Sequence, residues 1–80
     1  MTRARITLLA RSDCHLCDAA VEVIRRVAAE LGTGWEPVDV DGDPRLRAEY
    51  GDRVPVVLID GIEHASFSVH EQQLRAALRG

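Results

Sequence analysis

The stretch that decides the fold is residues 6–17, which have the sequence ITLLARSDCHLC. Its first half, residues 6–10, is an apolar run with no charged residue, which is typical of a strand buried on both faces of a sheet. Its second half carries two cysteines, Cys14 and Cys17. The next apolar residues are spaced as in a helix. We therefore expect the cysteine pair where a strand is followed by a helix.

The helix is indicated by apolar residues that recur in steps of three and four, which places them on one face. These residues are Cys17, Val21, Ile24, Ala28 and Leu31. Gly32 and Gly34 then end the helix.

The middle of the chain predicts an edge strand and a short helix. Residues 35–40 form the strand, and Pro37 within it cannot donate to a strand ladder, so the strand should lie at the edge of the sheet. Asp43 suits the N-cap and Pro44 the first turn of the following helix, which Gly51 ends.

The last third predicts a hairpin and a closing helix. Two strands, residues 54–59 and 62–65, flank Asp60 and Gly61, a pair that tolerates the positive φ angles of a tight turn. Ser68 and Glu71 have the spacing of a capping box at the start of a helix. The inward residues of that helix are expected to be Leu74, Ala77 and Leu78.

The resulting order is β-α-β-α-β-β-α, which predicts a single α/β domain spanning residues 1–80. We expect a four-stranded mixed sheet with helices on both faces. Right-handed crossover of the first βαβ unit puts the first and third strands in the centre.

Composition narrows the classes of function. The chain has 80 residues and a formal net charge of −3, so it lacks the excess of basic residues expected for binding nucleic acid or an anionic membrane. The apolar stretch at residues 6–10 is too short for a signal peptide or a membrane span. We therefore expect a monomeric cytoplasmic protein, in which closely spaced cysteines are catalytic or metal-binding more often than structural.

The cysteine spacing favours thiol–disulfide exchange. Cys14 should lie at the helix N-terminus, where free N–H groups and the helix dipole stabilise a thiolate and lower the pKa of the thiol. Cys17 should lie on the buried face. Cys14 is therefore the expected nucleophile and Cys17 the resolving thiol, and Arg11 and a protonated His15 would support the thiolate. We expect no bound cofactor, because the Cys14–Cys17 disulfide is itself the redox-active group.

Two other uses of the pair stay open at the level of sequence. The first is a metal carrier that binds an ion through Cys14 and Cys17. A closed zinc site needs four ligands, and beyond this pair the chain has only three scattered histidines, so no metal site is predicted. The second is a redox-inert adaptor that retains the fold for protein binding.

The chain resembles the glutaredoxins and glutaredoxin-like proteins of the thioredoxin superfamily over nearly its full length. The resemblance is carried by residues 11–17 (RSDCHLC), residues 38–41 (VDVD), Val54-Pro55 and the hairpin at Asp60-Gly61. It implies a thioredoxin-like fold and electron transport by thiol–disulfide exchange. It also implies a cis Pro55 beside the cysteines, with Val54 binding the substrate backbone.

Two departures from the glutaredoxin pattern affect the expected partner. Glutaredoxins carry Pro and Tyr between their cysteines, whereas this chain has His15 and Leu16. Residues 65–68 (ASFS) also replace the Gly-Gly pair and acidic residue with which glutaredoxins bind glutathione. We therefore expect a protein or small-thiol disulfide as substrate and an NADPH-linked reductase or a low-molecular-weight thiol as electron donor, without a specific prediction of glutathione.

Overall fold

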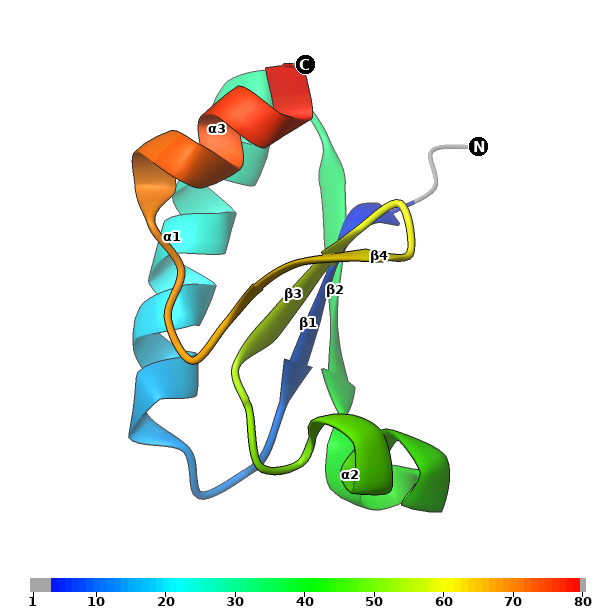
Figure 1. Ribbon diagram of the computed structural model, residues 1–80. Helices are drawn as coiled ribbons and strands as arrows, with labels where there is room; N and C mark the ends of the chain where they lie inside the picture. Colours follow the sequence, from blue (N-terminus) through cyan, green and yellow to red (C-terminus); the bar gives the residue numbers. More distant parts are fainter. Residues whose placement is uncertain (1–3, 80) are drawn as a thin grey trace.

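The computed structural model describes residues 4–79 and contains the predicted order of helices and strands (Figure 1). A short 3₁₀ helix, η1, is inserted before the second helix. The elements are β1 (Ala4–Ala10), α1 (His15–Leu31), β2 (Gly34–Asp39), η1 (Val40–Gly42), α2 (Pro44–Tyr50), β3 (Val56–Ile59), β4 (Ile62–Ser66) and α3 (Glu71–Arg79).

The four strands form one mixed sheet in the order β2-β1-β3-β4. Strand β1 pairs in parallel with β2 and antiparallel with β3, and β3 pairs antiparallel with β4. The central places of β1 and β3 are thereby confirmed. Pro37 lies on the edge strand β2 opposite Leu8, where its missing N–H group costs no internal ladder bond.

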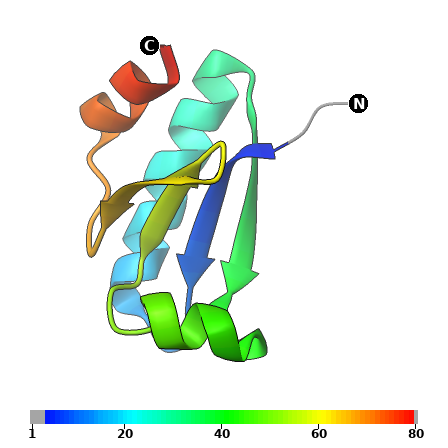
Figure 2. The same ribbon diagram turned by 45° about the vertical axis from the view of Figure 1, so that its right-hand side comes forward.

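The two faces of the sheet are covered by different helices. Side chains alternate along a strand, so Leu8 and Val57 belong to the core under α1 and α3, whereas Leu9 and Val56 contact the cluster formed with η1 and α2. Figure 2 shows α2 across the end of the sheet at which β1 and β2 terminate. Helix α1 begins at this same end, which therefore carries the cysteines.

The buried face of α1 differs slightly from the predicted one. Its buried residues are Cys17, Ala20, Ile24, Val27 and Ala28. Val21 and Leu31 are partly buried and pack against the margin of this core. Cys17 remains on the buried face, and Gly32, at φ 66°, ends the helix with its N–H bonded to the Ala28 carbonyl.

The predicted start of α3 is wrong. The helix begins at Glu71, because Phe67 has a φ of 67° and the Ser68 N–H bonds back to the Ser66 carbonyl, which makes a turn at the position expected for the N-cap. The Glu71 carboxylate instead pairs with Arg26 of α1 and with Arg75.

Two further details of the C-terminal half correct the prediction. Leu74 and Leu78 are buried as expected, but Ala77 is exposed. Strand β3 begins at Val56 instead of Val54, since Pro55 has no N–H for a ladder.

Among the described helices, none combines the length and the hydropathy that a membrane crossing requires.

Candidate active site

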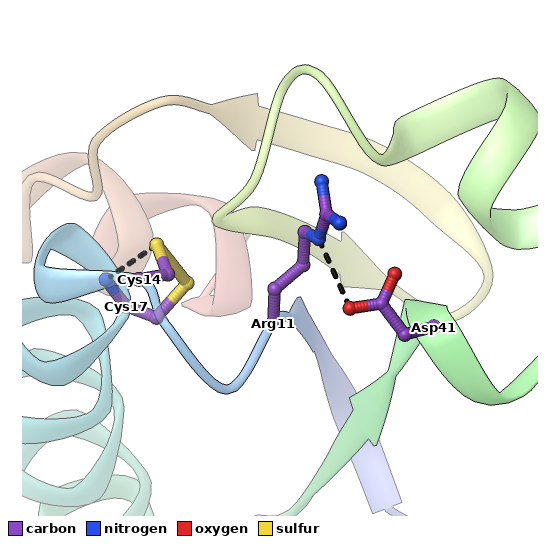
Figure 3. Close-up of a disulfide and its surroundings, with 4 residues drawn as sticks. All are labelled: Arg11, Cys14, Cys17 and Asp41. Atoms are coloured by element: carbon purple, nitrogen blue, oxygen red, sulfur yellow. Dashed lines mark hydrogen bonds and ion pairs between the residues drawn. A yellow bond between two sulfur atoms is a disulfide. The ribbon is translucent and has the colours of Figure 1, made fainter.

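The two cysteines occupy unlike positions at the start of α1 (Figure 3). Cys14 is the N-cap residue and is partly exposed, whereas Cys17 lies one turn later on the buried face and is 4% exposed. They are joined by a disulfide with a Cα–Cα distance of 5.2 Å, which lies within the usual range for disulfides. Solvent therefore reaches Cys14 but scarcely reaches Cys17.

The helix start also provides a hydrogen bond to the exposed sulfur. The Cys17 N–H donates to Cys14 Sγ at 3.2 Å. Such first-turn N–H groups have no partner within the helix and carry its positive dipole end. A thiolate at Cys14 would accept this hydrogen bond more strongly than the disulfide sulfur does.

Cys14 opens into a cleft of about 320 Å³ at the end of the sheet. Three separate segments contribute to it: the β1–α1 loop, η1, and the chain from the end of α2 to Val54. The lining residues are Arg11, Ser12, Asp13, Cys14, Asp41, Gly51 and Val54. The fold thus brings the predicted residues Arg11, Cys14 and Val54 to one surface.

Pro55 and His15 are chain neighbours of residues that line this cleft, Val54 and Cys14. The Val54–Pro55 peptide bond is cis, and Pro55 is fully buried in the chain leading to β3. His15 is exposed and lines a second, smaller hollow of about 190 Å³. The two hollows share Ser12, Asp13 and Cys14, so Cys14 is accessible from both.

Arg11 has a partner that sequence reasoning missed. Its Nε donates to Asp41 Oδ2 at 3.1 Å, and Figure 3 shows the side chain directed toward that carboxylate. The guanidinium is therefore engaged by Asp41 instead of being held against the sulfur. The expected sheet topology could have indicated this ion pair, because Asp41 follows a strand parallel to β1 and the two strands end at the same edge.

Phe67 is a second residue that sequence reasoning missed. It has a left-handed backbone, its side chain is half exposed, and its N–H donates to the Arg53 carbonyl at 3.1 Å. This bond holds the β4–α3 loop beside the chain that leads into Val54. No local signal predicts it, because an aromatic residue rarely adopts this backbone conformation.

Several charged groups farther from the cysteines form ion pairs. Arg53 bonds to both carboxylate oxygens of Glu63, and Arg75 bridges Glu30 and Glu71. The Arg75 and Arg26 guanidiniums lower the pKa of Glu71. Within residues 4–79, no group of three or more His, Cys, Asp or Glu side chains is arranged to hold a metal ion.

Comparison with known proteins gives the family. The model of the glutaredoxin-like domain (DUF836) matches residues 5–79. The uncharacterized protein Rv0508 of Mycobacterium tuberculosis is 44% identical over 81 residues, which cover 95% of this chain and 84% of that protein. The X-ray structure of protein XcR50 from X. campestris is 36% identical, covers 92% of this chain and 95% of that chain, and superposes with a TM-score of 0.77.

More distant solved structures share the fold. Protein Ne2328 of Nitrosomonas europaea has a TM-score of 0.78 at 23% identity, covering 96% of this chain and 93% of that chain. A glutaredoxin of Archaeoglobus fulgidus has a TM-score of 0.65 at 20% identity, covering 96% and 88%. The matches of the family model and of the 44% identical relative show that the chain belongs to the glutaredoxin-like family (DUF836).

Proposed function

We propose that the protein is a thiol–disulfide oxidoreductase that alternates between a dithiol and the Cys14–Cys17 disulfide. The observation that carries the proposal is the unlike exposure of two sulfurs within bonding reach. Cys14 faces a cleft at the N-terminus of α1, and Cys17 is buried directly behind it. Exchange through a mixed disulfide needs one sulfur that a substrate can reach and one that only the first sulfur can reach.

The reaction begins with the reduced protein. The Cys14 thiolate attacks one sulfur of a substrate disulfide, a mixed disulfide forms, and the other substrate sulfur leaves as a thiolate that takes a proton from water. Cys17 then loses its proton and attacks Cys14 Sγ, which releases the second substrate thiol and forms the internal disulfide. Two electrons pass from the protein to the substrate in each cycle.

The surroundings of Cys14 support the individual steps. The Cys17 N–H group that bonds to Cys14 Sγ stabilises the attacking Cys14 thiolate. Val54 lines the same cleft, which supports the proposal that its backbone pairs with an extended substrate segment. We assign a supporting electrostatic role to Arg11, which lines the cleft, and to His15 of the adjoining hollow when it carries a proton.

The same proposal includes the physiological setting. The protein works as a monomer in the cytoplasm, on disulfides of proteins or of small thiols. In this proposal the cysteine pair is the redox group, so an electron donor must restore its reduced form after each cycle. That donor is an NADPH-linked reductase or a low-molecular-weight thiol.

Paired serine variants test the mechanism. Reduced wild type, Cys14→Ser and Cys17→Ser are each mixed with a protein disulfide such as that of insulin, and intact mass is measured after quenching with an alkylating agent. Cys14→Ser should form no adduct, and Cys17→Ser should accumulate a mixed disulfide on Cys14. Circular dichroism of each variant controls for folding. Retained disulfide reduction by Cys14→Ser would refute the assignment of the nucleophile.

A further inference from the structure

The surface around Cys14 has an uneven charge distribution. Among the described residues that line its two hollows, the carboxylates are Asp13, Asp18 and Asp41, and Arg11 is the one Arg or Lys. Three carboxylates against one guanidinium leave two net negative charges when His15 is neutral. A substrate disulfide must therefore approach the nucleophile through an acidic environment.

The one guanidinium among these described lining residues is partly neutralised by Asp41. Arg11 is held by Asp41 at 3.1 Å, and 41% of the Arg11 side chain and 33% of the Asp41 side chain remain exposed. An incoming carboxylate that approaches the other N–H groups of the guanidinium does so beside the negative charge of Asp41, which weakens the attraction. Asp13 immediately precedes Cys14 and lines both hollows, and Asp18 lies in the first turn of α1. These carboxylates repel an anion that approaches either side of the sulfur.

We propose that the site selects disulfides flanked by positive charge, such as those in peptide segments rich in arginine or lysine, over anionic disulfides such as oxidised glutathione. Asp13 and Asp41 are the residues that set this preference, Asp13 by its own charge and Asp41 by its charge and its hold on Arg11. The inference rests on the proposed oxidoreductase function and names the substrate class for that site.

The preference acts at the encounter of the two molecules. Opposite charges raise the rate of encounter and like charges lower it, by about tenfold or more when several charges are aligned and salt is low. Near 1 M salt, charges more than about 3 Å apart are largely screened. A preference that originates in charge must therefore disappear as salt is added, whereas a preference that originates in shape persists.

Three small disulfides of similar size test the inference: cystamine, which is cationic, hydroxyethyl disulfide, which is neutral, and dithiodipropionate, which is anionic. Fully reduced protein is mixed with each probe, quenched with N-ethylmaleimide, and the oxidised fraction is followed by mass. Each rate is divided by the rate of the same probe with dithiothreitol, which removes differences in intrinsic reactivity. We expect a cystamine-to-dithiodipropionate ratio of about ten near 0.01 M salt, approaching one near 1 M salt.

Charge variants locate the effect. Asp13→Asn and Asp41→Asn should each lower the ratio about threefold at low salt. Asp41→Asn should also speed the reaction with dithiodipropionate, because it releases Arg11. Glu36→Gln is the matched control: it removes the same charge from the start of β2, where Glu36 lines a hollow with Arg5 and Asp60 at the far end of the sheet. It should leave the ratio unchanged.

The outcomes separate the two proposals. Oxidation of the protein by the neutral probe supports the oxidoreductase function, and a failure to oxidise overturns both proposals. If the neutral probe reacts but the charged probes react equally, only the charge selection is overturned. A change in Glu36→Gln as large as that in Asp13→Asn would also overturn it, because the preference would then belong to the net charge of the whole protein.

Discussion

Replacing Gly51 with alanine should destabilise the protein because there is no room for a methyl group. Gly51 is buried at the C-terminal end of α2, and its N–H bonds to the Arg47 carbonyl at 2.9 Å. A Cβ atom built on it lies 2.5 Å from that carbonyl oxygen. Since carbon does not approach a backbone oxygen closer than 3.0 Å, the chain must shift by at least half an ångström.

The size of the effect follows from comparable changes. Overpacking by one methyl group costs about 1–3 kcal/mol, and a domain of this size has roughly 4–12 kcal/mol of stability in total. With each kcal/mol worth about 4–8 °C, Gly51→Ala should lower the midpoint of thermal unfolding by roughly 5–20 °C. Circular dichroism at 222 nm measures the midpoint.

Gly42 provides the matched control. It lies in η1, which precedes α2 in the chain, and a Cβ atom built on it has no neighbour within 4 Å. Gly42→Ala should therefore raise the stability by about 0.4–1 kcal/mol, because alanine has less freedom to lose on folding. Equal unfolding midpoints for the two variants would refute the steric reasoning.

Three more predictions test other parts of the structure. Phe67→Gly should raise the free energy of unfolding by about 1 kcal/mol, measured in urea, because it relieves a left-handed backbone at a half-exposed side chain; a loss of stability would show that the ring packs more than its exposure suggests. Leu74→Ala should lower the free energy of unfolding by about 2–5 kcal/mol in the same assay, because Leu74 is fully buried. Its control, Ala77→Ser at an exposed position of α3, should change the free energy of unfolding by less than about 0.5 kcal/mol. Hydrogen bonds from Arg75 and Arg26 lower the pKa of Glu71 in the folded state, so the stability that Glu71 contributes is complete above the pKa of a free glutamate and is lost as the pH falls through the lowered value. The free energy of unfolding in urea, measured between pH 7 and pH 3, should therefore depend less on pH in Glu71→Gln than in the wild type. Parallel curves for the two proteins would contradict the assignment.

The sequence alone predicted those features that depend on neighbouring residues or on chain order. The helix N-terminus at Cys14 follows from periodicity, and the tight turn at Asp60 and Gly61 has both residues at positive φ as expected. The edge position of Pro37 follows from its chemistry and from the handedness of the first crossover. Each of these rests on a local rule that the rest of the fold does not oppose.

The features that escaped prediction depend on residues far apart in the chain. Arg11 and Asp41 are separated by 30 residues, and only the parallel pairing of β1 with β2 brings them together. The expected capping box at Ser68 fails because the turn at Phe67 delays the helix, and Glu71 is used instead to join α3 to α1. Tertiary contacts therefore decided the details that local patterns left open.

The most direct test of the proposed site is the order in which the two thiols react in the native protein. Fully reduced wild type is treated with less than one equivalent of iodoacetamide, and peptide mapping gives the fraction of label on each cysteine. Cys14 should be labelled at least about tenfold faster than Cys17, because it is the exposed thiol at the helix N-terminus and Cys17 is 4% exposed. Equal labelling, or labelling of Cys17 first, would contradict the division of roles on which the proposed function depends.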